Sequence, residues 1–344
     1  INSTSIKSKE LEYMKGECLG LRAFLHFDVA RLFAEDYTRS TSSTRGIPYS
    51  TTFDLNNKEL LTLHKTYEAI LADLNEAETL LANDTVVNVE TSPTSDYLKG
   101  RGVLFNKYAV AATKARVYYA MGNYTEAARY AQQVLDATSN FKLKKLSSLD
   151  DVKRYPANGE MIFGLYNDKL SSNISEMFLN ATSRGNFTEA RRDIEDLYDK
   201  SSLSATSTDL RLTTYYREAT AVSSGKTFSF VRFIESTAAV TNSPLKGITL
   251  IRLPEMYYIL AEANYDTNPT KAVQYLNDVR NSRGLEDVNA NKTSSKEAFE
   301  KELMRERMRE MPGEGQVFYA LKHFNRSFTD YRNMVTFQPS STIF

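Results

Sequence analysis

The 344-residue sequence has little of the chemistry that disulfides and metal sites require. It contains one cysteine, Cys18, and three histidines, His26, His64 and His323. A single cysteine cannot form a disulfide within the chain, and the sequence has no zinc-type spacing of ligands. We therefore expect no metal site and no cofactor.

The sequence also lacks an excess of either charge and any long apolar run. Lys and Arg total 43, as do Asp and Glu, so the formal net charge is zero. This balance gives no reason to expect a nucleic-acid or anionic-membrane partner. No run approaches the roughly 18 apolar residues of a transmembrane helix. The opening residues, INSTSIKSKELEY, have neither the basic start nor the apolar core of a signal peptide, so we expect any signal sequence to lie outside this sequence.

Tryptophan is absent, whereas the sequence has 21 Tyr and 18 Phe residues. Hydrophobic residues make up 41% and charged residues 25% of the chain, as in ordinary soluble globular proteins. A chain of this length can bury a large core as one big domain or about two smaller ones. Any aromatic surface must be built from Tyr and Phe.

Apolar residues at alternating steps of three and four predict a long first helix over residues 7–36. Its buried stripe is predicted to contain Leu11, Met14, Cys18, Leu21, Leu25 and Leu32. We expect Cys18 to be a small core residue and Asp28 to be a buried carboxylate paired with an arginine or a backbone donor. An active-site role for Asp28 is the alternative. A second helix is predicted over residues 58–82.

The clearest helical pair is 109-AVAATKARVYYAMGNYTEAARYAQQVL-135. Ala115 and Ala127 allow two helices to approach closely, Gly122 ends the first helix, and Tyr118 and Tyr124 fill the wedge between them. These are the signature positions of a tetratricopeptide unit. Helices return over 252–265 and 269–285, where Pro269 suits a first turn, and again over 295–311 and 312–326. The sequence therefore predicts about four helical hairpins.

The segment between these hairpins changes character. Helical periodicity fades over residues 139–248, and short β-favouring runs occur at 161–166, 212–216 and 228–234. One helix is predicted near 188–200. The segment is too rich in Phe and Tyr to remain unfolded, so we expect it to pack on the helices.

These patterns predict a mainly α fold in which tetratricopeptide-like hairpins form a scaffold and a loop-rich mixed segment with short strands packs on it. We expect one unit over residues 1–344. Its parts are hairpins at 7–138, the mixed segment with the ligand face at 139–248, further hairpins at 249–326 and a tail at 327–344.

The charged stretch 299-FEKELMRERMRE-310 is where catalytic carboxylates would be sought first. Its pairs Glu302–Arg305 and Glu306–Arg309 have a spacing that stabilises a helix by about 0.2–0.5 kcal/mol each. No second carboxylate motif completes a glycosidase pair. We therefore predict structural ion pairs here and no enzymatic activity.

Several stretches together resemble one known family. They are 21-LRAFLHFDVARLF-33, 250-LIRLPEMYYILAEANY-265 with 273-VQYLNDVRNSRGL-285, and 305-RERMREMPGEGQVFYALKH-323. With the hairpin at 106–137 and the strand 160-EMIFGLY-166, their order and spacing resemble the SusD/RagB family of outer-membrane nutrient-binding lipoproteins of Bacteroidetes-type bacteria. The resemblance covers essentially the whole chain.

The resemblance implies a fold, a location and a partner. Family members have about four tetratricopeptide-like helical pairs, with a loop-rich segment that supplies the ligand face. A lipidated N-terminal cysteine holds them on the cell surface, where they form the lid of a SusC/RagA-type TonB-dependent transporter. They capture glycans, or in some members peptides, without chemistry. The implied partners here are that transporter and an oligosaccharide, with membrane contact only through an anchor outside this sequence.

The chain departs from the family pattern at two places. The lipid-bearing cysteine and the N-terminal segment are absent from this sequence, and Cys18 is not the anchor. Near the C-terminus the family often shows an aspartate between an aromatic residue and a leucine, and here that position is Ala320. This removes an expected member of a salt bridge, whereas Glu314 and Gly315 keep the pattern.

Ligand residues can be predicted only from their chemistry. Sugar rings pack their C–H faces on aromatic planes, and their hydroxyl groups need amides, carboxylates or Arg at the rim. Without Trp, stacking must come from Tyr and Phe or from the absent N-terminal segment. The predicted ligand-binding residues are Tyr166, Asn167, Phe187 and Tyr198, followed by Tyr215 and Tyr216. Strand alternation would make only one of the last two available, and core packing is the alternative for every aromatic residue named.

Three other functions compete with glycan binding. An oligopeptide-binding member of the same family is favoured by the many Tyr and the absent Trp. A tetratricopeptide scaffold that binds a partner's tail would need a basic clamp on regular repeats. A helical-barrel glycoside hydrolase would need six or seven regular hairpins and two placed carboxylates.

Overall fold

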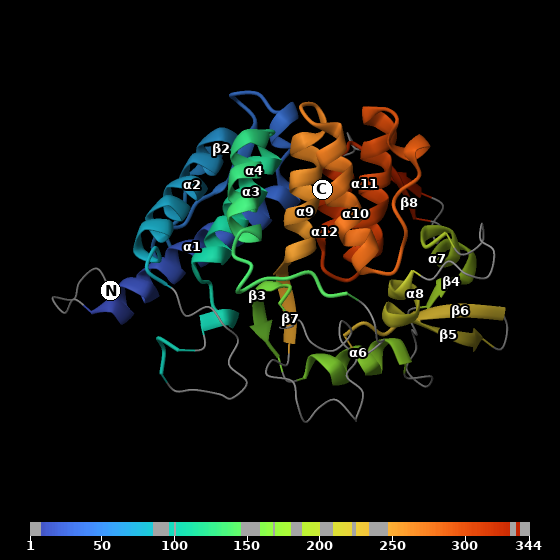
Figure 1. The fold of residues 1–344 in the computed structure, drawn as a ribbon. Coiled ribbons are helices and arrows are strands. Elements are labelled where there is room, and N and C mark those ends of the chain that lie inside the picture. Colours follow the sequence, from blue (N-terminus) through green and yellow to red (C-terminus); the bar gives the residue numbers. More distant parts are fainter. Residues whose placement is uncertain are drawn as a thin grey trace.

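The computed structural model describes residues 8–84, 96–99, 101–145, 159–167, 169–179, 188–199, 209–221, 225–233, 247–330 and 335–337. Helices dominate and pack in pairs across the upper layer of the molecule (Figure 1). The pairs are α1 (Lys9–Phe33) with α2 (Leu63–Leu80), α3 (Lys107–Ala120) with α4 (Tyr124–Leu135), α9 (Leu253–Tyr265) with α10 (Pro269–Ser282), and α11 (Lys296–Glu310) with α12 (Gln316–His323). This arrangement confirms the predicted mainly α fold with about four helical pairs.

The α3–α4 hairpin forms as the sequence predicts. Asn106 caps α3, since its Oδ1 accepts hydrogen bonds from the backbone N–H groups of the second and third residues of the helix. Ala115 and Ala127 are fully buried where the two helices meet. Gly122 turns the chain at a φ of 71°, and a Cβ there would lie 3.1 Å from Cγ2 of Thr38. The turn is therefore tight enough to touch the end of the first helical pair.

The α9–α10 hairpin repeats this design. Ala261 and Ala272 are fully buried, and Pro269 is the first residue of α10. Gly284, with a φ of 84°, follows the end of α10.

Helix α1 buries a different face from the predicted one. Its buried residues are Tyr13, Gly16, Leu19, Gly20, Ala23, Phe24, Phe27 and Ala30. Four residues of the predicted stripe are exposed instead: Leu25, at 59%, and Met14, Cys18 and Leu32. Leu11 and Leu21 are half-buried, and Leu21 packs against the core. The prediction was wrong because apolar residues occur all around this helix, and two glycines, Gly16 and Gly20, let the other face approach its neighbours more closely. Asp28 is half-buried and pairs with Arg31, which confirms the predicted partner type.

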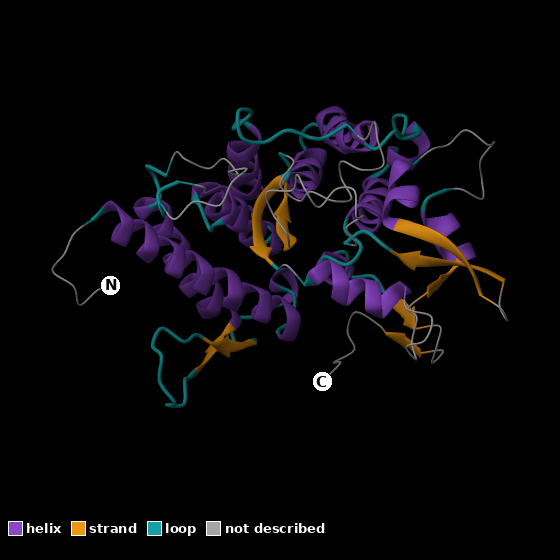
Figure 2. Ribbon diagram, turned by 90° about the horizontal axis from the view of Figure 1, so that it is seen from below, coloured by secondary structure: helices purple, strands orange, loops and turns teal. Residues whose placement is uncertain are grey.

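The strands form small antiparallel sheets below and beside the helices (Figures 1 and 2). β1 (Arg45–Pro48) pairs with β2 (Leu60–Thr62), and β3 (Met161–Tyr166) pairs with β7 (Gly247–Arg252). β6 (Gly225–Phe230) lies between β4 (Thr188–Ala190) and β5 (Tyr216–Ala221), and β8 (Phe328–Asp330) pairs with β9 (Val335–Phe337). The remaining helices are α6 (Leu170–Leu179), α7 (Arg191–Leu197) and α8 (Leu210–Tyr215), with short 3-10 turns at Tyr37–Arg39, Arg101–Val103 and Ala290–Thr293.

The mixed segment agrees with the sequence prediction in part. The strand predicted at 161–166 is present as β3. The strand predicted at 228–234 is only partly correct, because β6 spans Gly225–Phe230 and residues 231–233 are not in a strand. The strand predicted at 212–216 is wrong, because α8 occupies Leu210–Tyr215 and the strand starts only at Tyr216. The helix predicted over 188–200 is shortened to α7, and α6 was not predicted because its polar residues hide the apolar period.

Two clusters of buried hydrophobic residues form the core. The main cluster joins the helical pairs with β3 and β7. The second lies within the mixed segment and consists of Ile194, Tyr198, Leu212, Tyr215, Tyr216, Phe228 and Phe230. In the described part of the chain, no helix combines the length and apolar character needed to cross a membrane.

A buried ion network joins the mixed segment to α11. The carboxylate of Glu310 is fully buried and accepts hydrogen bonds from Arg211, Arg252 and Arg283 at 2.8–3.2 Å. Burial alone would raise the pKa of Glu310, but the guanidinium groups of Arg283 and Arg252 hold it well below its usual range. Because these arginines come from α8, β7 and the end of α10, one carboxylate ties three elements to α11.

The charged residues of α11 form ion pairs, and the predicted pair Glu306–Arg309 is confirmed. The predicted pair Glu302–Arg305 is wrong, because each of these residues binds a partner on another turn or element. Glu306 binds Arg309 at 2.5 Å and also contacts Arg211 and Arg280. Glu302 contacts the same Arg280 and Arg309, whereas Arg305 pairs with Asp199 of the mixed segment.

We predict that Glu310→Gln lowers the free energy of unfolding by about 3–5 kcal/mol, because it leaves three buried guanidinium groups without their central carboxylate. Chemical denaturation at pH 7 measures this change. Glu126→Gln is the control: it breaks an exposed pair with Arg129 and should cost less than about 1 kcal/mol. Equal losses in the two variants would contradict a special role for the buried network.

Candidate functional site

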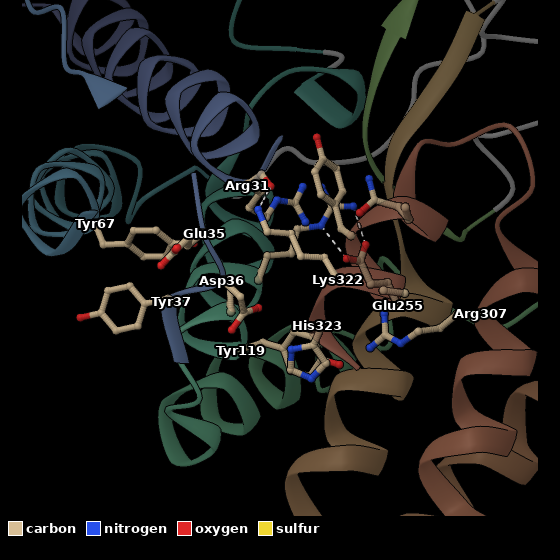
Figure 3. A pocket seen from close by; sticks show the side chains of 15 residues that line it. Arg31, Glu35, Asp36, Tyr37, Tyr67, Tyr119, Glu255, Arg307, Lys322 and His323 are labelled. Atoms are coloured by element: carbon tan, nitrogen blue, oxygen red, sulfur yellow. Dashed lines mark hydrogen bonds and ion pairs between the residues drawn. The ribbon is translucent and has the colours of Figure 1, made fainter. Parts of the chain in front are cut away.

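A cavity and a groove lie next to each other where the first two helical pairs meet the last two. The inner cavity has a volume of about 50 Å³ and is shown in Figure 3. It is lined by Arg31, Glu35, Asp36, Tyr37, Tyr67, Arg116, Tyr119, Ala120, Glu255, Arg307, Gln316, Tyr319, Ala320, Lys322 and His323. The outer groove has a volume of about 630 Å³ and is lined by Tyr37, Thr38, Met121, Gly122, Tyr124, Glu262, Glu300, His323, Phe324 and Asn325. The two share Tyr37 and His323.

The ends of several helices bring the groove residues together. Tyr37 opens the 3-10 turn that follows α1, and Gly122 and Tyr124 belong to the α3–α4 turn. Phe324 caps the C-terminus of α12, where Asn325 adopts a φ of 52°. Because helix ends carry unpaired backbone groups and variable side chains, such a junction offers polar groups next to aromatic rings.

Glu262 of α9 is the polar centre of the groove. Its carboxylate accepts hydrogen bonds from the hydroxyl groups of Tyr119, at 2.5 Å, and Tyr124, at 3.0 Å, and lies 2.7 Å from Nε2 of His323. Burial would raise the pKa of Glu262, but the charge of His323, these hydrogen bonds and Arg307 together lower it. Both carboxylate oxygens are therefore engaged, and Glu262 is an ionised group that fixes its neighbours.

Aromatic rings surround this carboxylate at the border between the groove and the inner cavity. Tyr119 stacks on His323 with ring centroids 4.3 Å apart, and the ring of Tyr124 meets Tyr119 edge-on at 6.1 Å. Tyr37, which lines both spaces, packs against Tyr67 of the inner cavity at 4.7 Å. Glu300 is half-buried, and its pKa is raised by burial and by the charge of Glu262. The groove thus combines ring faces, an amide and carboxylates.

The inner cavity is rich in cationic side chains. Arg116 is buried and donates to both oxygens of Glu255, at 2.7 and 2.5 Å, and to the carbonyl of Leu250 at 2.8 Å. The ammonium group of Lys322 donates to the backbone carbonyls of Arg31 and Ala34. Burial lowers the pKa of Lys322 to about 8.

Arg307 completes the cationic set on the α11 side of the cavity (Figure 3). Its guanidinium carbon lies 5.1 Å from the ring centre of Tyr119 and 5.5 Å from that of Tyr258. These contacts hold the side chain in place through cation–π attraction.

The residues predicted to bind ligand lie away from this junction. Tyr166, 67% exposed, ends β3, and Asn167 follows it on the surface. Tyr198, Tyr215 and Tyr216 are buried in the second core cluster.

The structure assigns these three tyrosines to packing. The hydroxyl of Tyr198 donates to the carbonyl of Arg309 at 2.9 Å, so this side chain joins the mixed segment to α11. Tyr216 packs edge-on against Phe228 and Phe230 at 6.4 and 5.7 Å. Phe187 lies outside the described residues. Among the described candidates, the structure therefore brings Tyr198, Tyr215 and Tyr216 together in a buried cluster and leaves Tyr166 and Asn167 as neighbours on the surface.

Sequence reasoning missed the groove. Its residues come from five separate segments spread over positions 37–325, and no motif links them. Tyr124 was predicted only as a wedge between helices, a role that it combines with the hydrogen bond to Glu262. Among the described residues, no group of three or more His, Cys, Asp or Glu side chains is arranged to hold a metal ion.

We predict that Glu262→Gln changes the pH dependence of stability. A carboxyl group whose pKa is lowered on folding stabilises the protein above its ordinary pKa of 4.5, and this contribution is lost as the pH falls. Glu262→Gln should be less stable than the wild type at pH 7. The difference should narrow as the pH falls below 4.5, because there the unfolded state binds a proton at Glu262 before the folded protein does.

Denaturation midpoints at several pH values between 7 and 3 test this. Glu59→Gln, which alters an exposed carboxyl group, should follow the wild type throughout. A difference between Glu262→Gln and wild type that stays constant with pH would contradict the prediction.

Two family models match the chain. The model described as "SusD family" matches residues 115–341, and the model described as "Starch-binding associating with outer membrane" matches residues 1–119. The search of curated proteins found no match.

Solved structures share the fold. A SusD superfamily protein from Bacteroides thetaiotaomicron VPI-5482 matches with a TM-score of 0.76 and 23% identity, over 98% of this chain and 76% of that one. A SusD superfamily protein from Bacteroides vulgatus ATCC 8482 matches with a TM-score of 0.73 and 22% identity, over 95% and 70%. A SusD-like carbohydrate binding protein from the same organism matches with a TM-score of 0.71 and 18% identity, over 98% and 71%. With a family model that spans most of the chain and a fold shared along nearly its whole length, the chain belongs to the SusD family.

Proposed function

We propose that this protein binds an oligosaccharide in the outer groove and passes it, chemically unchanged, to a SusC/RagA-type TonB-dependent transporter. The observation that carries the proposal is the groove itself, whose volume of about 630 Å³ lies within the range of small-molecule sites. One matching family model is described as starch-binding, and one solved relative is described as carbohydrate binding.

The groove lining suits a sugar. The rings of Tyr37, Tyr124 and Phe324 offer apolar faces for the C–H side of a pyranose. The amide of Asn325 and the carboxylate of Glu300 lie at the same groove and can bond sugar hydroxyls. Glu262 fixes the hydroxyl of Tyr124 and thereby the plane of its ring. This preorganisation reduces the entropy lost when a ligand binds.

Two carboxylates in one groove raise the question of hydrolysis. A glycosidase needs one carboxyl as acid and a second as base or nucleophile. Glu300, with its raised pKa, could donate a proton, but both oxygens of Glu262 are held by Tyr119, Tyr124 and His323. Glu262 is therefore poorly placed to attack a sugar or activate water, which supports binding without catalysis.

A second ligand surface is part of the proposal. Tyr166 and Asn167 stand exposed at the end of β3 and present a ring beside an amide. They lie on the mixed segment, away from the groove, and could contact the far end of a long oligosaccharide. A peptide ligand is the alternative for either surface, since Tyr rings also pack on peptide side chains.

The proposed location and partner are based on the membership of the chain in the SusD family. We place the protein at the outer membrane on the cell surface, held by a lipid anchor outside this sequence. The helical pairs would dock on the transporter.

We predict that Tyr124→Ala weakens oligosaccharide binding by at least about tenfold, because it removes one ring face and frees Glu262. The measurement is a glycan-array screen followed by calorimetry, with maltoheptaose as the first probe. Tyr124→Phe keeps the ring and should retain most of the affinity. Tyr166→Ala separates the two surfaces: a larger loss there than in Tyr124→Ala would move the main site to the end of β3, and selective capture of peptides would favour the alternative ligand.

We also predict that the purified protein releases no reducing ends from any glycan that it binds. A reducing-sugar assay over many hours, with a known glycosidase as the positive control, measures this. Product release that disappears in Glu300→Gln would show that the groove is catalytic and would refute a role in binding alone.

A further inference from the structure

Arg307 is a buried cation without a matching anion among the described residues. Arg307 is only 6% exposed, and no described residue accepts a hydrogen bond from its Nε or Nη2 atom. No described carboxylate lies within ion-pair distance of it, in contrast to Arg309 and Arg305 on the same helix, which are paired. Glu262, whose pKa Arg307 helps to lower, acts on it only from beyond that distance and is bound by other side chains. An unpaired buried guanidinium is costly, since burying a charge without a partner loses its hydration.

The inner cavity lies against this side chain and contains other unused donors. Nη1 of Arg116 and Nε of Arg31 also lack acceptors among the described residues, and both residues line the cavity. Lys322, on the same wall, is bonded only to backbone carbonyls in the described structure. The donors around this space therefore outnumber the acceptors.

The carboxylates that line the cavity do not supply the missing charge. Glu255 is bound to Arg116, and Asp36 is held by Thr38 and Arg39. Glu35 is exposed. These three groups face other partners or solvent, and the methyl group of Ala320 takes up little space on the α12 side of the cavity.

We propose that the inner cavity binds a small anion, a halide ion or a single carboxylate group, through Arg307 together with the free donor of Arg116. A volume of about 50 Å³ suits an ion of this size, whereas a sugar ring requires the outer groove. The guanidinium fork matches a carboxylate well and also binds a halide. The anion neutralises Arg307 and joins α11 to α3, which stabilises the junction on which the outer groove is built. This inference does not depend on glycan binding.

Thermal unfolding in chloride-free buffer tests the proposal in solution. Chloride or formate is titrated against methanesulfonate at constant ionic strength, so that general screening does not change. The wild type should show a saturable rise in Tm, as expected for a ligand that binds only the folded state. Galacturonate and galactose are compared in the same assay to distinguish a free anion from the carboxylate of an acidic sugar. A rise in Tm with galacturonate, but not with chloride, formate or galactose, would assign the site to the sugar acid.

Three variants make the test specific. Arg307→Gln removes the binding charge and should lose the response to anions while remaining folded. Ala320→Asp places a carboxylate at the cavity and should be less responsive to anions but at least as stable as the wild type without them. Ala320→Asn, of the same shape but neutral, should be less stable than Ala320→Asp, because it fills the space without neutralising Arg307.

Crystals soaked in sodium bromide provide a direct readout. An anomalous peak within hydrogen-bond distance of Arg307, absent from Arg307→Gln, is the expected result. A cavity that holds only water, or an anion response of equal size in wild type and Arg307→Gln, would overturn the proposal. Maltoheptaose affinity, measured in parallel, stays informative about the groove whichever result is obtained.

Discussion

The mutual attraction of buried arginines and glutamates along α11 holds this structure together. Glu306 and Glu310 lie on one side of the helix and receive guanidinium groups from the mixed segment, from β7 and from the end of α10. Apolar packing alone does not specify how two cores orient, because it is not directional. Charge-assisted hydrogen bonds are directional, and they therefore specify this orientation. The network thus fixes where the second core cluster lies on the helical pairs.

The same helix contacts both the mixed segment and the inner cavity. Arg305 and Arg309 reach Asp199 and the backbone of the mixed segment, whereas Arg307 points to the cavity between the helical pairs. Residues two positions apart on a helix do not lie on the same face, so Arg307 contacts a different part of the structure from Arg305 and Arg309. On the cavity side the outer groove is built from helix ends, and Gly122 allows the α3–α4 turn to approach Thr38 closely enough to form one wall.

The helical pairs were predictable from the sequence because their causes are local. Small residues at Ala115, Ala127, Ala261 and Ala272 permit close approach, and the periodic apolar residues give the helices their length. The buried face of α1 was not predictable in the same way, because apolar residues occur on more than one side of it and the choice depends on what packs there. Local pattern sets the element, and tertiary contacts select its face.

The candidate site was harder to predict for a related reason. Tyr215 and Tyr216 are suitable stackers by chemistry, but the second core cluster takes both. An aromatic side chain buries so much apolar area that packing competes with any binding role. Groove residues such as Tyr37 and Phe324 are nearly 300 positions apart and meet only after folding, so no spacing rule could have joined them. Tyr and Phe, the residue types predicted for a ligand surface, do line the candidate groove, but at positions that the sequence did not indicate.

The pairing of β3 with β7 affects which parts of the sequence can vary in evolution. Tyr166 lies opposite Gly247, so the chain leaves the scaffold and returns to it at adjacent points. Residues 167–246 therefore connect two paired strand ends. The entropic cost of closing a loop grows only slowly with the length of the loop. Insertions and deletions that spare the residues bonded to α11, such as Tyr198 and Arg211, can be accommodated while the helical pairs keep their path. The scaffold thereby tolerates variation in the rest of this stretch.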